Sequence, residues 1–249
     1  METLNLTPRS LDLSQFVKRS ALESDFTTLV KAPTLVCFDG QPKILYLKPD
    51  WDFDLLGSTL NQLEFQVSER TGGLKTTSRV FGFQPRVALR RDFCTATSLA
   101  HTNPDANALV SSFATKVESL YSTFFDTTHA VHSSLTRSKV LPEWRIPNSC
   151  FTSGIINKNN PLKYHFDSGN FEDVCSCMIG LKRDVLGGYL SCPALDLGFE
   201  IGNGSLLIFD GQSLLHGVTP IKRLTPKAYR YTIVYYSLKG IWKCQPLDE

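Results

Sequence analysis

The chain has 249 residues, of which 42% are hydrophobic and 20% are charged, and its formal net charge is +2. A chain of this length is most often one domain, and this share of hydrophobic residues can form a sizeable core. The small net charge does not mark the chain as a nucleic-acid-binding protein, so any basic surface would have to be local.

The cysteines and the N-terminus bear on the compartment. Seven cysteines are an odd number without a paired spacing, as expected for reduced thiols. No stretch approaches the ~20 consecutive apolar residues of a membrane span. The first ten residues lack the basic-then-apolar pattern of a signal peptide. We expect a soluble, intracellular protein, in the cytoplasm or the nucleus, without a membrane partner.

Residues 1–149 are expected to support a later β-rich core. A short helix is predicted within 11–22 and a hairpin around Asp39-Gly40, between two apolar runs. The apolar spacing between residues 52 and 65 indicates a helix. These stretches carry no functional signal.

Residues 74–91 combine basic and aromatic side chains without an acid. The basic residues are Lys75, Arg79, Arg86, Arg90 and Arg91. Glycines and Pro85 predict a loop, in which Phe81 and Phe83 lie among the charges. Such a loop suits phosphate contact and base stacking, although the residues alone favour a solvated loop anchored by two phenylalanines. A second acid-free run, over residues 211–247, could add to a local positive face.

A helix is predicted over residues 105–135, because apolar residues recur there at spacings of three and four. We expect it to buttress a sheet. His129 and His132 lie three residues apart near its end. Such a pair can ligate a metal, but no third ligand is near in the sequence, and histidines at a helix C-terminus are more often surface residues.

Residues 150–240 are expected to form the core. Turn signals separate eight short apolar segments, over 150–157, 163–166, 174–181, 189–191, 198–201, 205–209, 214–218 and 229–237. Eight short strands with glycine turns fit a double-stranded β-helix, or jelly roll. The predicted fold is α+β and mainly β, with N-terminal helices buttressing this core, in one domain over residues 1–249.

Two histidines and a carboxylate within this core form a candidate metal site. His165 and Asp167 are two residues apart, so on a strand both side chains leave the same face. His216 follows beside another apolar strand. Such a set suits the facial triad of non-haem Fe(II) oxygenases, although zinc accepts the same ligands. Arg230, which shares a strand face with Thr232, is suited to gripping a small carboxylate, and this favours a keto-acid co-substrate over zinc hydrolysis.

In these motifs the chain resembles the 2-oxoglutarate- and Fe(II)-dependent dioxygenases, and within them the TET/JBP-like branch, which oxidises the 5-methyl group of pyrimidines in DNA. The resemblance runs from about residue 151 to 238 and rests on H-x-D-x-x-N from His165, G-G-Y-L-S-C-P from Gly187, I-F-D-G from Ile208, H-G-V-T-P-I from His216 and R-x-T-I-V-Y from Arg230.

The resemblance implies roles for these residues. His165, Asp167 and His216 would bind Fe(II), and Arg230 with Thr232 would bind the distal carboxylate of 2-oxoglutarate. Asn170 would face the target base. The co-substrate would be O2, with ascorbate as a supporting reductant, and the product a 5-hydroxymethylpyrimidine. DNA would be bound with the base flipped out, with Arg79, Phe81 and Arg86 as further substrate contacts.

Two other functions stay open at this point. One is a 2-oxoglutarate dioxygenase that hydroxylates a protein side chain, a nucleoside or a small metabolite. The other is a β-barrel binding protein without catalysis, against which the intact triad and arginine argue.

Overall fold

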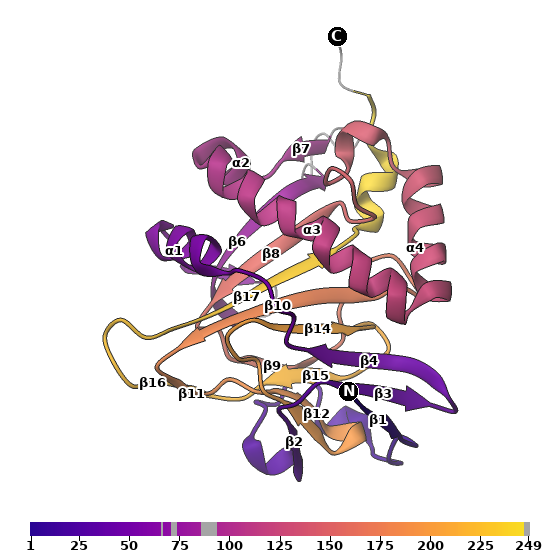
Figure 1. Cartoon of the computed structure of the whole chain (residues 1–249), viewed down its shortest axis with the longest axis vertical. Helices are drawn as coiled ribbons and strands as arrows, with labels where there is room; N and C mark the ends of the chain where they lie inside the picture. Colours follow the sequence, from indigo (N-terminus) through magenta and orange to yellow (C-terminus); the bar gives the residue numbers. More distant parts are fainter. Residues whose placement is uncertain (66, 71–73, 86–93, 247–249) are drawn as a thin grey trace.

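The computed structural model describes residues 1–65, 67–70, 74–85 and 94–246, with the backbone alone for 68–70 and 74–75. Within these ranges two sheets face each other, and helices cover the outer face of the larger one (Figure 1).

The larger sheet has ten strands among the described residues, in the order β1-β3-β4-β14-β10-β17-β8-β6-β5, with β7 paired to β6. These strands are β1 Glu2–Asn5, β3 Thr34–Phe38, β4 Gln41–Leu47, β5 Val67–Arg70, β6 Leu74–Pro85, β7 Cys94–Ala96, β8 Ser153–Lys158, β10 Ser176–Arg183, β14 Ser205–Phe209 and β17 Tyr229–Tyr236.

The smaller sheet has the order β2-β13-β12-β15-β9, and β11 pairs with β16 beside it. The strands are β2 Thr28–Val30, β9 Leu162–His165, β12 Leu190–Cys192, β13 Leu197–Phe199, β15 His216–Val218, β11 Val185–Gly187 and β16 Ile221–Arg223.

The helices lie mostly in the first 150 residues. They are α1 Asp54–Gln62, α2 Ser98–Thr102, α3 Pro104–Phe124 and α4 Asp126–Lys139, with 3-10 turns η1 Leu13–Gln15, η2 Glu23–Asp25, η3 Pro142–Trp144, η4 Pro193–Leu195 and η5 Lys239–Lys243. Among the described residues, no helix has the length and apolar character needed to cross a membrane.

The predicted jelly roll is confirmed. Each of the eight predicted segments contains a strand: β8, β10, β14 and β17 lie together in the larger sheet, and β9, β12, β13 and β15 in the smaller one. Antiparallel strands that alternate between two facing sheets are the arrangement of a double-stranded β-helix. The N-terminal strands β3 and β4 extend the larger sheet beside β14.

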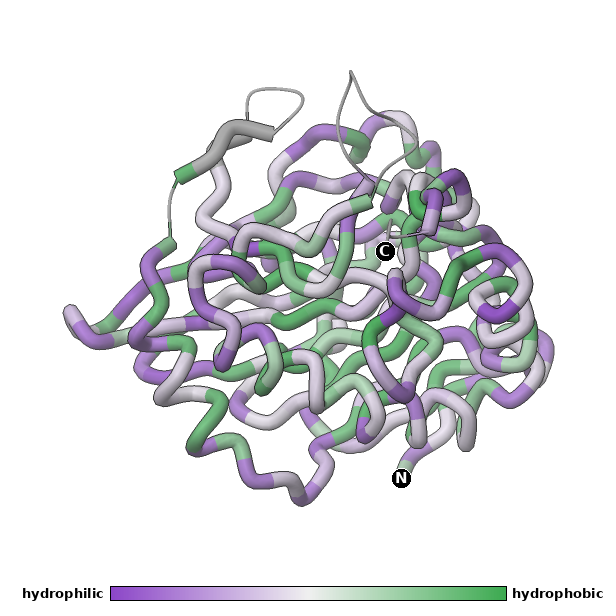
Figure 2. The backbone as a smooth tube through the Cα atoms, turned by 90° about the horizontal axis from the view of Figure 1, so that it is seen from above, coloured by the Kyte–Doolittle hydropathy of each residue, from purple (hydrophilic) through white to green (hydrophobic). Residues whose placement is uncertain are grey.

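The two faces of the larger sheet have different neighbours. On β17, Tyr231, Ile233 and Tyr235 pack into the main hydrophobic core together with buried side chains of α3. Arg230, Thr232 and Val234 leave the opposite face and line a cavity between the sheets, as the two-residue period of a strand requires. Hydrophobic segments accordingly gather in the interior of the molecule, whereas hydrophilic ones lie at its periphery (Figure 2).

The predictions for residues 1–149 need corrections. Residues 74–85 form the strand β6 rather than a loop, because their backbone pairs with β8 from Ser78 to Gly82. The single helix predicted over 105–135 is two helices, since Phe125 leaves the helical conformation between α3 and α4. In the stretch 11–22 the structure has the short turn η1.

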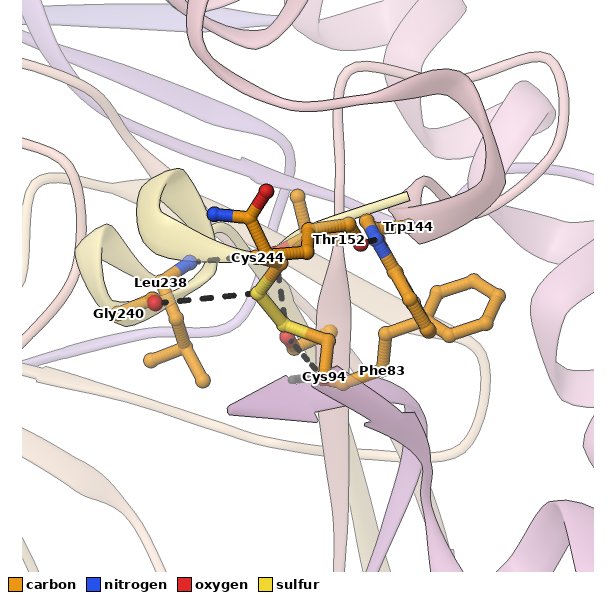
Figure 3. The surroundings of a disulfide bond; sticks show 9 residues. Phe83, Cys94, Trp144, Thr152, Leu238, Gly240 and Cys244 are labelled. Carbon is orange, nitrogen blue, oxygen red and sulfur yellow. Dashed lines mark hydrogen bonds between the residues drawn. A yellow bond between two sulfur atoms is a disulfide. The ribbon is translucent and has the colours of Figure 1, made fainter. Parts of the chain in front are cut away.

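A disulfide corrects the expectation that the thiols are reduced. Cys94 of β7 is bonded to Cys244, which follows η5, across a sequence separation of 150 residues (Figure 3). The other five cysteines are free and buried. A pairing over so long a separation has no local sequence signal, because only the tertiary fold brings β7 and η5 together.

We expect the disulfide to stabilise the chain by roughly 2–5 kcal/mol, because it closes a long loop and so restricts the unfolded state. Urea unfolding with and without a reductant measures this difference. In a Cys94→Ser/Cys244→Ser variant the reductant should leave the midpoint unchanged. Equal midpoints for the oxidised and reduced native chain would contradict the expectation.

Candidate active site between the two sheets

A cavity of about 470 Å³ lies between the two sheets and brings together most of the predicted site residues. His165, Asp167 and His216 line it from the smaller sheet and the segment after β9, and Arg230 and Thr232 line it from β17. Apolar side chains of both sheets, including Met178, Leu190 and Val234, complete its walls. A largely apolar cavity with a few converging polar groups is the usual form of a small-molecule site.

The three predicted metal ligands converge. His165 ends β9 and His216 begins β15, and these two residues are direct partners in the antiparallel ladder. The Nε2 atoms of His165 and His216 lie 3.6 and 3.8 Å from Oδ1 of Asp167. One potential ligand atom from each residue lies within 4.8 Å of the others. Strand pairing therefore places two imidazoles and a carboxylate around one point.

Backbone carbonyls orient both imidazoles for coordination through Nε2. The Nδ1 atom of His165 lies 2.8 Å from the carbonyl of Lys163, and Nδ1 of His216 lies 2.9 Å from that of Leu214. Because a carbonyl only accepts a hydrogen bond, each Nδ1 carries the proton and each Nε2 presents its lone pair. Burial lowers the pKa of His216, which keeps this imidazole neutral, as a metal ligand must be.

Because Gly211 has no side chain, the carboxylate of Asp167 can lie directly against its backbone. The backbone N–H of Asp167 donates to the carbonyl of Gly211 at 2.9 Å. A Cβ atom at position 211 would lie 2.2 Å from Oδ2 of Asp167 and 3.3 Å from Cε1 of His216. Any side chain there would displace the carboxylate from the two histidines.

We expect Gly211→Ala to weaken metal binding by roughly 10–100-fold, as loss of support around a metal site typically does. Anaerobic titration with Fe(II) measures the affinity. Gly202→Ala is the matched control, because its added Cβ would meet only Glu200, at 3.9 Å. Unchanged Fe(II) affinity in Gly211→Ala would contradict the expectation that the carboxylate needs the space left by Gly211.

The donor set fits Fe(II). Two neutral imidazoles and one carboxylate on one side of a metal leave further positions open for other ligands, which is the arrangement used by non-haem Fe(II) oxygenases. Zinc accepts the same donors, so the triad alone does not select the metal.

Arg230 is a buried cation on the cavity wall. It is 1% exposed, and among the described residues its Nε and Nη2 atoms have no hydrogen-bond partner. Burial lowers its pKa to about 10, so it remains charged at neutral pH. An unpaired buried charge is costly, and a bound carboxylate would satisfy it through a bidentate contact.

Neighbouring residues hold this guanidinium in place. Gly188, at φ +71°, lies so close that a Cβ there would be 2.7 Å from Cδ and Nε of Arg230. Lys182 of β10 is the direct strand partner of Arg230. Burial lowers the pKa of Lys182, and the charge of Arg230 acts in the same direction. Lys182 does not itself line the cavity, so the positive charge on this part of the cavity wall is that of Arg230.

The Thr232 hydroxyl is part of a polar group beside Arg230. It accepts a hydrogen bond from Nδ2 of Asn157 at 3.3 Å, and Asn157 in turn lies 3.4 Å from Nδ2 of Asn160. Both asparagines line the cavity. Neither asparagine was predicted as a site residue, although the polar run N-K-N-N at 157–160, directly after an apolar strand, indicates the position.

We expect Arg230→Met to raise the stability of the ligand-free chain by about 1–3 kcal/mol, because it replaces an uncompensated buried charge with an apolar chain of similar length. The same variant should lose binding of 2-oxoglutarate. Urea unfolding and calorimetric titration measure the two effects. Arg183→Met, which removes an exposed arginine on β10, should change neither. A fall in stability would instead give Arg230 a structural role.

Asn170 also lies on the cavity wall. It is 8% exposed, and its Nδ2 lies 3.4 Å from the hydroxyl of Ser176. An isolated bridge to Leu238 fixes its backbone. Its role as a base-facing residue stays a prediction.

Two predicted substrate contacts point away from the cavity. Phe81 is fully buried on the helix side of β6, where its ring packs edge-on against Tyr235. Arg79, on the same face, donates to the hydroxyl of Thr102 in α2. Their neighbours Ser78 and Val80 line the cavity instead, because side chains alternate along a strand. Stacking of Phe81 on a base was therefore a wrong prediction. Arg86 lies outside the described residues.

The chain is similar to curated proteins that act on thymine. It is 30% identical over 110 residues to the bifunctional helicase and thymine dioxygenase JBP2 of Trypanosoma brucei brucei (strain 927/4 GUTat10.1), over 44% of this chain and 10% of that protein. It is 23% identical over 171 residues to the JBP2 of Leishmania braziliensis, over 68% of this chain and 15% of that protein. The chain thus spans only a small part of these relatives. No protein-family profile matches it.

Solved structures show the fold. NgTET1 in complex with 5mC DNA superimposes with a TM-score of 0.63 at 18% identity, over 88% of this chain and 82% of that one. An oxidoreductase of the 2OG-Fe(II) oxygenase family from Burkholderia pseudomallei gives a TM-score of 0.50 at 15% identity, over 78% and 85%. The chain therefore has the jelly-roll fold of the 2-oxoglutarate and Fe(II) oxygenases.

Proposed function

We propose that this chain, a TET/JBP-like member of the 2-oxoglutarate- and Fe(II)-dependent dioxygenases, hydroxylates the 5-methyl group of a pyrimidine base in DNA. The observation that carries the proposal is the buried guanidinium of Arg230, whose Nε and Nη2 have no partner among the described residues, in the same cavity as the triad. The named activities of the similar proteins, on thymine and with 5mC DNA, support the choice of base and polymer.

The chain supplies ligands for both cofactors. His165, Asp167 and His216 would hold Fe(II), and Arg230 with the Thr232 hydroxyl would bind the far carboxylate of 2-oxoglutarate. When bound, iron and 2-oxoglutarate with O2 supply the oxidation of an unactivated C–H bond, with release of succinate and CO2. Ascorbate would support turnover by keeping the iron reduced.

The position of the proposed metal site within the cavity limits which substrates can reach it. The proposed metal ligands line a cavity between the two sheets, so a base in a duplex would have to leave its stack to reach them. The amide of Asn170, three residues after Asp167, would contact that base. Because an amide offers both a donor and an acceptor, it suits the Watson–Crick edge of either thymine or 5-methylcytosine. A DNA substrate would place the protein wherever DNA is held, in the nucleus or the cytoplasm.

A second candidate is hydroxylation of a nucleoside, a small metabolite or a protein side chain by the same cofactors. The specific observation in its favour is that Phe81 is fully buried and Arg79 is directed to Thr102 of α2, so neither side chain extends the cavity as a DNA-binding surface. The salt dependence of substrate binding distinguishes the two candidate functions. Binding of DNA through its phosphates would weaken steeply as the salt concentration rises.

Incubation with Fe(II), 2-oxoglutarate, ascorbate and DNA containing either 5-methylcytosine or only thymine tests the proposal. Mass spectrometry of the digested nucleosides should show one base heavier by an oxygen atom. His165→Ala and Arg230→Ala should abolish this product, and Arg183→Ala should retain it. Succinate formed with a free nucleoside but not with DNA would support the second candidate. Failure to bind both Fe(II) and 2-oxoglutarate would overturn both candidates.

A further inference from the structure

A second cluster of metal-binding side chains lies apart from the cavity between the sheets. Glu118 of α3, His129 of α4 and Cys150, which precedes β8, each place one ligand atom within 4.8 Å of the others. They line a separate cavity of about 440 Å³, which shares no lining residue with the first. His129 has no third ligand near it in the sequence, but the fold places Glu118 and Cys150 beside it.

Hydrogen bonds already orient these donors. The Oε1 atom of Glu118 lies 2.7 Å from Nε2 of His129, and Oε2 accepts the backbone N–H of Cys150 at 2.9 Å. The Cys150 carbonyl accepts from the hydroxyls of Thr136 and Ser237 at 2.7 and 2.9 Å. The position of the thiol therefore depends on a backbone that is held from three sides.

We propose that Glu118, His129 and Cys150 bind a zinc ion that joins α3, α4 and the segment leading into β8. Thiolate sulfur, imidazole nitrogen and carboxylate oxygen are the three donor types that zinc takes in proteins. A thiolate ligand selects zinc over Mg²⁺ and Ca²⁺, which require oxygen. The triad, which has no sulfur, remains the site for iron.

The geometry requires only small movements. Zinc–ligand bonds of about 2.0–2.3 Å at tetrahedral angles place neighbouring donor atoms about 3.3–3.7 Å apart. The Glu118–His129 contact of 2.7 Å would open slightly, and pairs near the 4.8 Å limit would close by about 1 Å. The fourth position would face the cavity and be filled by water, as in zinc sites with three protein ligands.

Charge and protons balance at this site. Zinc binding forms a sulfur–zinc bond and releases the thiol proton to solvent. The Nε2 proton that His129 donates to Glu118 in the metal-free chain also leaves that nitrogen, and the ring coordinates as the tautomer with its proton on Nδ1. Thiolate and carboxylate then offset the two charges of the ion. Arg145, on the same cavity wall, directs Nε to the carbonyl of Val140 and Nη2 to that of Arg137.

Without a metal, Glu118 would serve only as a hydrogen-bond acceptor that ties α4 and Cys150 to α3. The variant Cys150→Ser distinguishes a metal site from a purely hydrogen-bonded cluster. It removes the sulfur ligand but retains the backbone N–H that donates to Glu118 and leaves His129 in place.

Cobalt titration of the metal-stripped full chain tests the proposal, because Co²⁺ bound by a thiolate gives a near-ultraviolet charge-transfer band that the sulfur-free triad cannot produce. We expect this band in the native chain and in His165→Ala, which lacks a ligand of the other site and should saturate the band at one equivalent. Zn²⁺ should displace the band, and Cys150→Ser should lose it. His129→Gln should weaken Zn²⁺ binding by more than about 100-fold. Ser133→Ala is the matched control, because it removes a hydroxyl 3.1 Å from His129 Nε2. That nitrogen would bind the metal, so the hydroxyl has no hydrogen bond to it in the zinc-bound chain and the variant should retain Zn²⁺ binding.

X-ray absorption at the zinc edge of the native chain provides a readout that needs no variant. A sulfur neighbour at about 2.3 Å is expected. No thiolate band at saturating cobalt, a band that persists in Cys150→Ser, or a zinc spectrum without sulfur would each overturn the proposal. Zinc binding does not depend on the dioxygenase reaction, so either proposal can fail alone.

Discussion

The alternation of side chains along β17 is the constraint on which the rest of the site depends. Tyr231, Ile233 and Tyr235 pack against the helices, so Arg230 and Thr232 must face the other sheet. A slip of one residue would bury the tyrosines in the cavity and place the guanidinium in the apolar core. Pairing with β8 and β10 on either side prevents this slip. The packing of the tyrosine rings against the helices thus determines which side chains of β17 face the cavity between the sheets.

The candidate active site lies between the sheets because its two halves come from different sheets. The histidines are partners in the smaller sheet, and Arg230 projects from the larger one. A small dicarboxylate-like molecule that chelates a metal at one end and meets a guanidinium at the other would span this gap. The buried charge of Arg230 lowers stability until such a partner arrives, as is common at functional sites.

The helix layer on the outer face contributes by keeping β17 and β10 in place. The hydroxyl of Tyr235 donates to the carbonyl of Val110, and the hydroxyl of Tyr121 accepts the N–H of Cys175. The Glu118–His129–Cys150 cluster ties α3, α4 and the start of β8 together on this same side. A zinc ion there would strengthen the layer that positions the strands, without touching the reaction.

The sequence by itself predicted the eight strands of the jelly roll and the pairs His165 with Asp167 and Arg230 with Thr232, because strand periodicity and short spacings are local properties. His216 is distant from the first pair in the sequence, and only the order of the three residues and the motifs around them linked it to that pair. The sequence did not reveal that residues 74–85 form a strand, since glycine and proline there resemble loop signals and only pairing with β8 resolves the choice. The tertiary structure alone decided that Phe81 faces the core, that Gly211 makes room for Asp167, and that Glu118, His129 and Cys150 meet. These features depend on contacts between segments distant in the chain, and such contacts leave no periodic trace in the sequence.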